Sequence, residues 1–224
     1  NGGIGRTKKS KTARYLAGRY LQLTPLAWRR IPQNKFYMIA SKGLHKMTLN
    51  QLGQLFPITI QDYSDKWSEF YQSESKLIID SFSKSDFVRI DHIGSTAIPG
   101  LKAKPTIDIL LQVSGHIDIH KIKRVFKSLG YNINEHPENP PPHLTFVKGY
   151  TKYGIKGQSY HVHIRYKGDW NEIRFRDYLI NHKEIAKEYE NIKLELADKY
   201  RNDREAYTDS KTDFIERINK LTRK

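Results

Sequence analysis

The chain has 224 residues, enough for one hydrophobic core or for one core with an appendage. Hydrophobic residues make up 38% and charged residues 28%, as in soluble globular proteins with a polar surface. The absence of cysteine excludes disulfides, thiolate metal sites and cysteine nucleophiles. No run of about 18 apolar residues occurs, so we expect no membrane span and, with no signal peptide recognised, a cytoplasmic protein.

The net charge of +15 is concentrated near the start of the chain. Residues 1–46 hold eleven Lys or Arg and no Asp or Glu, which leaves 39 − 11 = 28 basic and 24 acidic residues, a net of +4, in the rest. This near balance argues against nucleic acid as a partner of residues 47–224.

Residues 1–46 form a basic extension without a sustained helical or strand period. We favour sequence outside the native domain, because Met47 opens a segment of different composition. Two alternatives stay open: a basic nucleic-acid-binding arm with interleaved aromatic residues, and an Arg-rich transit peptide. The expected domain is therefore 47–224.

Apolar periodicity and turn residues predict the elements of this domain in chain order. They are a helix within 62–82, strands at 87–93 and 106–113, a helix over 119–129, a proline-rich loop at 139–142, and strands at 144–148 and 160–166 joined by a Gly- and Lys-rich excursion around 150–158. Gly130 stands at the position after a helix end, and Asp169 and Ser210 are candidate N-caps in a helical C-terminal part. This order predicts an α/β or α+β fold, a small mixed sheet flanked by helices with a helical C-terminal end.

Gly94-Ser95 follows directly after the first predicted strand. Glycine lets the backbone turn tightly and approach a ligand, and a serine hydroxyl with exposed N–H groups can hold a phosphate. Most Gly-Ser pairs are simple turns, so this signal is weak. Lys104, further along the same loop, is either a point charge for a phosphate or a solvated lysine.

Asp108 lies inside the apolar strand that follows this turn. Side chains alternate along a strand, so Asp108 faces away from Ile107 and Ile109. A carboxylate inside an apolar strand is costly unless it is paired or coordinates a cation. A structural aspartate is the alternative, and its position directly after the turn favours a functional one.

His161 and His163 form a His-x-His pattern on a predicted strand, on one face with Arg165. Two imidazoles on one face can bind phosphate, transfer a proton or ligate a metal. A half-exposed strand with polar residues facing outward explains the pattern equally well.

Four segments in order resemble the GrpB family of predicted nucleotidyltransferases. The run HIGSTAIPGLKAKPTID, from His92 to Asp108, matches the family pattern H-x-G-S-T-A-x-P-G-L-x-x-K-P-x-x-D. YHVH, FRDYL and the Y-T-x-x-K-x-x-F element follow at 160–163, 175–179 and 207–214. The resemblance covers about residue 47 to the C-terminus and leaves residues 1–46 outside.

This resemblance implies a nucleotidyltransferase-like fold that binds a nucleotide or another phosphorylated small molecule. In such folds a Gly-Ser turn holds phosphates and carboxylates on the next strand hold two Mg²⁺ ions for in-line transfer. It implies that Asp108 ligates Mg²⁺ or Mn²⁺. For an active enzyme we expect Asp108, His161 and His163 to be the catalytic residues, with a histidine as the acid or base. The phosphate contacts that it implies are Gly94, Ser95, Thr96, Lys104, Arg176, Lys193 and Lys211. Helix-surface or loop charge is the alternative for the last three.

The sequence departs from the active pattern two residues after Asp108, where Leu110 stands in place of a second carboxylate. Leucine cannot coordinate a hard cation that prefers oxygen ligands. Two functions therefore remain: metal-assisted nucleotidyl or phosphoryl transfer, and binding of a phosphorylated ligand without catalysis. An RNA-associated role would rest on residues 1–46.

Overall fold

The computed structural model describes residues 44–135, 142 and 144–223. The chain divides into two compact units, residues 1–32 and 33–224, and every described element belongs to the second. The expectations for residues 1–43 and for the proline-rich loop at 139–141 lie outside the described residues.

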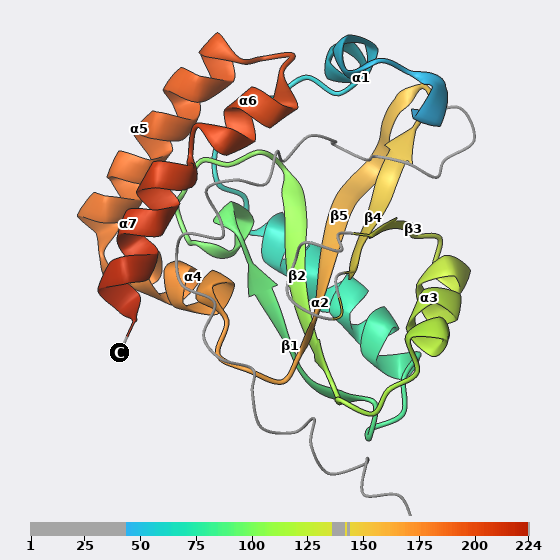
Figure 1. The fold of residues 1–224 in the computed structure, drawn as a ribbon. Helices are drawn as coiled ribbons and strands as arrows, with labels where there is room; N and C mark the ends of the chain where they lie inside the picture. Colours follow the sequence, from blue (N-terminus) through green and yellow to red (C-terminus); the bar gives the residue numbers. More distant parts are fainter. Residues whose placement is uncertain (1–43, 136–141, 143, 224) are drawn as a thin grey trace, which may run out of the picture. The chain divides into compact units, whose positions relative to one another are not determined.

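A five-stranded mixed sheet forms the centre of this unit (Figure 1). Its strands are β1 (Phe87–Ile93), β2 (Thr106–Val113), β3 (Asn132–Glu135), β4 (Leu144–Thr151) and β5 (Gly154–Tyr166), in the order β1-β2-β5-β4-β3. Only β2 and β5 run parallel to each other, and the other neighbours are antiparallel. The sheet, its flanking helices and the helical C-terminal end confirm the expected mixed α/β class.

Helical segments surround this sheet. They are η2 (Leu44–Lys46), α1 (Leu49–Leu55), α2 (Lys66–Asp80), η3 (Ser95–Ala97), α3 (Ile119–Ser128), α4 (Asn171–Asn181), α5 (Lys183–Lys199), α6 (Arg204–Asp209) and α7 (Thr212–Thr222). Strands β1 and β2 have their predicted bounds, whereas α1, β3 and α6 had not been predicted. All three are short, with seven, four and six residues, so a periodic pattern has little length in which to develop.

The excursion predicted around residues 150–158 is wrong, because β4 and β5 continue through most of it as a hairpin. A register shift between Lys148 and Tyr150 accommodates Gly149, which has a φ of +94°. A Cβ at Gly149 would stand 2.6 Å from the Gln158 backbone oxygen. Gly149 therefore permits a bulge within the ladder, and β4 continues past it.

The candidate N-caps of the C-terminal helices also differ from the structure. Trp170 precedes α4, and the Asp169 carboxylate pairs with Arg174 instead of capping the helix. Lys211, not Ser210, is the N-cap residue of α7. The prediction for Gly130 is confirmed, since it follows the α3 end with a φ of +81°.

The two faces of the sheet have different coverings. On one face, Ile107, Ile109 and Leu111 of β2 are fully buried with residues of α2 and α3 in the largest apolar cluster. A second cluster joins Ile98 and Leu101, after η3, to α4, α5 and α7. Helices α5, α6 and α7 gather on the side of β1 and β2 away from α2 (Figure 1). The alternation along β2 thus presents Asp108 to the face opposite the main core.

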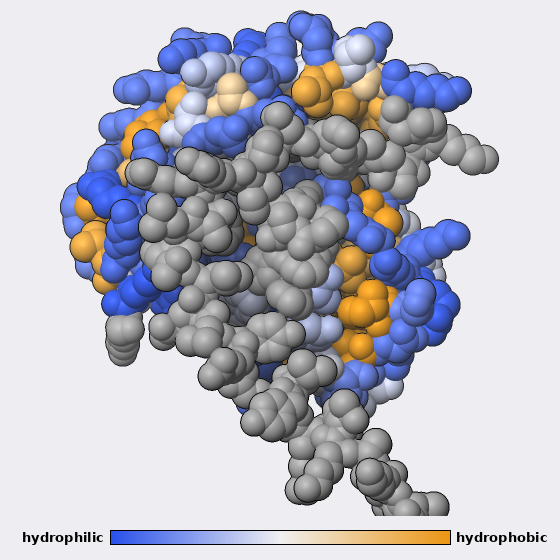
Figure 2. Space-filling view, viewed as in Figure 1, coloured by the Kyte–Doolittle hydropathy of each residue, from blue (hydrophilic) through white to orange (hydrophobic). Residues whose placement is uncertain are grey.

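The surface of the described residues is largely hydrophilic on the face drawn in Figure 2, with separate apolar areas. Exposed large apolar side chains occur on several elements, among them Leu77 on α2, Ile180 on α4 and Leu221 on α7. None of the helices within 44–135 and 144–223 has the length and apolar character needed to cross a membrane.

Candidate functional site

Strand register brings Asp108 together with residues of both neighbouring strands. Residues that are paired across neighbouring strands lie on the same face of the sheet. Two such rows of paired residues lie on the Asp108 face. One consists of Ile93, Asp108 and His161, and the other consists of Asp91, Leu110 and His163. The predicted site residues on β2 and β5 therefore lie side by side. Leu110, where a second acid was expected, lies between a carboxylate on β1 and an imidazole on β5.

Two imidazoles face one oxygen of the Asp108 carboxylate. The Oδ1 atom lies 3.3 Å from Nδ1 of His161 and 3.7 Å from Nε2 of His163. Burial by itself would raise the pKa of Asp108, but the hydrogen bonds from the two imidazoles outweigh it and hold the pKa below its usual value. Asp108 is therefore an ionised carboxylate at neutral pH.

His161 is a neutral imidazole between two partners. Burial lowers its pKa to about 4, although Asp108 acts in the opposite direction. The Tyr150 hydroxyl lies 2.8 Å from Nε2 of His161, and the two rings are stacked at 5.7 Å. A neutral imidazole carries one N–H, so Nδ1–H points to Asp108 and Nε2 accepts from Tyr150. Tyr150, His161 and Asp108 form a hydrogen-bonded chain.

The Gly94-Ser95 turn packs directly against this carboxylate. Gly94 has a φ of +71°, and a Cβ there would stand 2.6 Å from Oδ2 of Asp108. Glycine is thus required twice, by the backbone conformation and by the space that Asp108 fills. Burial raises the pKa of Tyr189 on α5 to about 12, and the Ser95 hydroxyl and Asp108 act on the same phenol. The Ser95 hydroxyl therefore connects the turn to Tyr189 of α5.

Thr96 and His92 hold this turn in place. The buried Thr96 hydroxyl donates to the Thr106 carbonyl oxygen at 3.0 Å and lies 3.1 Å from Nε2 of His92. The His92 ring stacks on Tyr71, and burial lowers its pKa to about 4. These contacts show that Thr96 and His92 stabilise the turn. A phosphate contact at Thr96 stays a prediction.

Lys104 and Lys211 lie near Asp108, and Arg204 and Lys193 lie next to these two lysines. Burial lowers the pKa of Lys104, in the loop before β2, well below its usual value, and nearby Arg204 and Lys211 add to the shift. Burial and Arg204 lower the pKa of Lys211 to about 8, against the opposing effect of Asp108. Burial and Lys211 lower the pKa of Lys193, on α5, to about 7. Three of the four predicted basic contacts thus converge.

Tyrosine rings position these cations. Lys211 Nζ lies 4.1 Å from the centroid of the Tyr207 ring, and Lys193 Nζ lies 4.9 Å from that of Tyr189. The Arg204 guanidinium stands over the Tyr150 ring at 5.9 Å. A cation over an aromatic face is attracted by the ring quadrupole.

The backbone of Lys102 ties α5 to the loop that carries Lys104. The Lys193 ammonium donates to the Lys102 carbonyl oxygen. The Lys102 N–H donates to the Glu190 carboxylate at 2.8 Å. One residue of the loop is thus held by two side chains that lie one turn apart on α5.

Arg176, the fourth predicted basic contact, is engaged elsewhere. Its guanidinium donates to the His92 carbonyl oxygen at 2.8 Å and lies 3.5 Å from the Asp91 carboxylate. Arg89 also donates to Asp91, which is buried. Asp91, on the same face as Asp108, is therefore already paired with two guanidinium groups.

The donor set does not fit two Mg²⁺ ions. Asp108 is the one carboxylate in its row, Asp91 is paired with arginines, and imidazole nitrogens are poor ligands for Mg²⁺. Among the described residues, no group of three or more His, Asp or Glu side chains has an arrangement that could hold a metal ion. Binding of one Mg²⁺ or Mn²⁺ ion by Asp108 stays a prediction.

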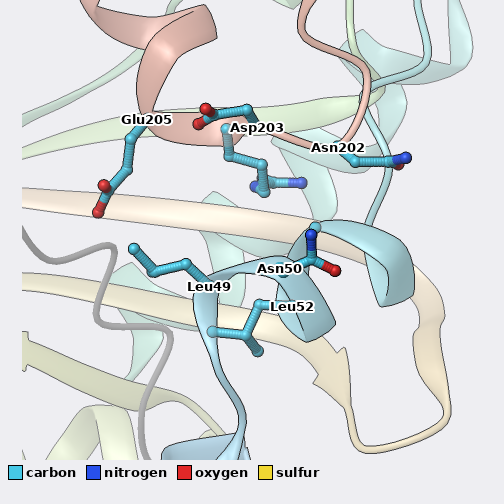
Figure 3. A pocket seen from close by; sticks show the side chains of 8 residues that line it. Leu49, Asn50, Leu52, Asn202, Asp203 and Glu205 are labelled. Atoms are coloured by element: carbon cyan, nitrogen blue, oxygen red, sulfur yellow. The ribbon is translucent and has the colours of Figure 1, made fainter.

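A pocket lies next to this site, between α1 and α6 (Figure 3). Its lining includes Asn50 and Gly53 of α1 and Asn202 and Arg204 at the start of α6, but not Asp108. A Cβ at Gly53 would stand 1.7 Å from the Asn202 backbone oxygen, and Arg204 donates to the Phe56 carbonyl oxygen at 2.9 Å. These contacts fix the end of α6 that supplies Arg204.

Three residues of the site were missed in the sequence: Tyr150, Tyr189 and Arg204. Tyr150 lies in the segment expected to be a loop, and Tyr189 has the spacing of an ordinary apolar helix residue. Arg204 lies three residues before the Y-T-x-x-K-x-x-F element at 207–214, and this proximity was the available signal.

Comparisons with known proteins agree with the resemblance. The family model described as GrpB protein matches residues 57–221. A UPF0157 protein of Pseudomonas aeruginosa is 37% identical over 68% of this chain, and the match spans 62% of that relative. The glutamate-rich protein GrpB of Alkalihalophilus pseudofirmus is 34% identical over 72% of this chain and 93% of its own length. The crystal structure of the conserved protein GrpB from Enterococcus faecalis matches with a TM-score of 0.62 and 26% identity, over 73% of this chain and 96% of that one.

Proposed function

We propose, given that this chain belongs to the GrpB family, that it binds a nucleotide or another phosphorylated small molecule on the Asp108 face of the sheet. The observation that carries the proposal is the basic cluster in which Lys104 and Lys211 lie near the Asp108 carboxylate, Arg204 lies near both lysines and Lys193 lies near Lys211. The fold is proposed to be of the nucleotidyltransferase type, because a Gly-Ser turn precedes the acid-bearing strand.

Charge is the physical reason for an anionic ligand. Lys104 and Lys211 both interact electrostatically with the Asp108 carboxylate and with Arg204, and burial, the main cause of their lowered pKa values, disfavours their charged forms unless an anion is bound. In the part of the chain that the structure describes, Lys104 and Lys211 form no ion pair. A phosphate group with two or more negative charges would satisfy several of these cations at once.

A second candidate is transfer of a nucleotidyl or phosphoryl group, with Asp108, His161 and His163 as the catalytic residues. The hydrogen-bonded chain that ends at Asp108 favours it, since paired acid and base groups are what proton transfer requires. A two-metal route is not part of this candidate, because Leu110 removes the second carboxylate.

Calorimetric titration with ATP and with inorganic triphosphate tests the binding proposal. Replacing Lys211 by Met should weaken binding by about tenfold or more, the worth of a charge-assisted hydrogen bond. Lys199→Met is the matched control, because Lys199 also lies over a tyrosine ring, 5.0 Å from the centroid of Tyr200, but on the last turn of α5 and exposed. Equal affinities of both variants and the unmodified protein would contradict the proposal.

The same titrations with Mg²⁺, Mn²⁺ or a chelator test the metal. Binding that depends on the metal and disappears in Asp108→Asn would support a metal ion at Asp108. Unchanged binding by this variant without metal would leave phosphate recognition to the cations alone.

A further inference from the structure

The two oxygens of the Asp108 carboxylate have different surroundings. Both imidazole contacts, from His161 and His163, go to Oδ1. Oδ2 lies on the side of Gly94, where an added Cβ would be 2.6 Å away. Within residues 44–135 and 144–223, no side chain donates a hydrogen bond to Oδ2. An ionised carboxylate accepts through both oxygens, so Oδ2 has an acceptor capacity that the described protein groups leave unused.

The surroundings of Oδ2 indicate what would satisfy it. A phosphate is attracted by Lys104 and Lys211 but is repelled by this carboxylate oxygen. A hydroxyl group is neutral, donates a hydrogen bond and fits beside a phosphate in one small molecule. A ligand that carries both groups therefore matches the cations and the carboxylate together.

Tyr150 keeps the other oxygen occupied. The Asp108 carboxylate can only accept, so it selects the His161 tautomer whose Nδ1–H points to Oδ1, and the Tyr150 hydroxyl, 2.8 Å from Nε2, holds the ring by donating to that nitrogen. The Tyr150 ring is buried and makes an edge contact with Phe56 at 5.3 Å between centroids. Packing thus sets the orientation of Tyr150, and the hydrogen bond from its hydroxyl then sets the orientation of the His161 ring.

We propose that the ligand of this site has a free hydroxyl beside its phosphate, that Oδ2 of Asp108 accepts a hydrogen bond from this hydroxyl, and that Tyr150 is a positioning residue acting through His161. The inference rests on the proposed function for its phosphate. It adds a substrate class, phosphorylated compounds with a neighbouring free hydroxyl, and a residue outside the predicted site.

Titrations in the presence of a chelator test the hydroxyl. The probes are ATP and its 2′-deoxy, 3′-deoxy and 2′,3′-dideoxy forms, with glycerol 3-phosphate and propyl phosphate as a smaller pair. A hydrogen bond to a charged group predicts that loss of the recognised hydroxyl weakens binding by about 10- to 100-fold. Equal affinity within both sets overturns the inference while leaving the proposed function intact.

Tyr150→Phe tests the positioning, since it removes only the hydroxyl and keeps the ring. We expect the preference for the hydroxylated probe to shrink to a few-fold, with the affinity for the hydroxyl-free probe unchanged. Tyr153→Phe on the same hairpin is the control, because Tyr153 is 83% exposed. An equal loss for both probes would show a merely structural role and overturn the positioning.

Nitrogen-15 NMR of the histidines provides a readout that needs no ligand, with His161→Gln for assignment. The expected signature is Nδ1–H in the unmodified protein and, in Tyr150→Phe, a shifted Nε2 resonance that reports the loss of the hydrogen bond this nitrogen accepts. An Nε2–H tautomer in the unmodified protein overturns the inference. Failure of every phosphate probe, inorganic triphosphate included, would refute the proposed function instead, and the Nε2 resonance would still decide the role of Tyr150.

Discussion

Replacing Gly94 by Ala tests the contact between the turn and the Asp108 carboxylate. The backbone at Gly94 has a φ of +71°, and an alanine Cβ would meet Oδ2, Cβ and Cγ of Asp108 at 2.6, 3.0 and 3.1 Å. The left-handed conformation costs an alanine about 1–2 kcal/mol. Overpacking against a held side chain adds about 1–3 kcal/mol, so the free energy of unfolding should fall by about 2–5 kcal/mol.

Gly100→Ala is the matched control for this variant. Gly100 has a φ of +77°, and a Cβ there would meet no atom within 4 Å. It should therefore lose only the conformational part, about 1–2 kcal/mol. Urea denaturation at pH 7 measures both losses, and their difference isolates the contact with Asp108.

A double-mutant cycle with Asp108→Ala sharpens this test. The second substitution removes Oδ2 and Cγ but keeps the aspartate Cβ, so it relieves part of the overlap. The loss from Gly94→Ala should be smaller in that background by about 1 kcal/mol or more. Equal losses at Gly94 and Gly100, with no coupling to Asp108, would refute the reasoning.

Three other substitutions test further contacts by denaturation. Gly53→Ala would place a Cβ 1.7 Å from a backbone oxygen of the α5–α6 loop, so it should lower the free energy of unfolding strongly. Gly115→Ala is the control, because a Cβ there would meet no atom within 4 Å. Equal effects of the two substitutions would contradict the close packing at Gly53. Lys148→Met leaves the buried Glu74 carboxylate without the ammonium 2.7 Å away and should cost about 3 kcal/mol, most of it restored by adding Glu74→Gln. A double variant as unstable as the single one would count against this pairing. His92, with its pKa lowered from 6.5 to about 4, binds a proton more readily in the unfolded state, so its contribution to stability is complete above pH 6.5 and declines toward pH 4. His92→Phe should make this decline shallower, and an unchanged pH profile would exclude the role.

The sequence predicted the acid-bearing strand and the face of Asp108 because both depend on local alternation. Asp91 could not be placed from the sequence, since its pairing with Leu110 depends on the register between β1 and β2. The structure shows that it shares the face of Asp108 and is held by Arg89 and Arg176. The register depends on both strands, so the sequence pattern of one strand does not determine it.

The basic residues illustrate a different limit. Lys193 and Lys211 have the pattern of ordinary helix-surface charge, and only the packing of the C-terminal helices brings Lys211 near Asp108 and Lys193 near Lys211. Tyr150 was missed for another reason, because it lies in the Gly- and Lys-rich segment 150–158 that was predicted to leave the sheet, whereas the structure has a hairpin there. In both cases the deciding information is a contact between segments far apart in the chain.

The two bonds from α5 to the Lys102 backbone have a mechanical consequence. The loop residue that precedes Lys104 by two positions is fastened to the helix at Lys193 and Glu190. Displacement of α5 would therefore carry the Lys104 ammonium with it, while Asp108 stays fixed in the middle of the sheet between β1 and β5. The spacing between Lys104 and the carboxylate thus depends on the docking of α5, and a ligand that bridges the two would resist the undocking of that helix.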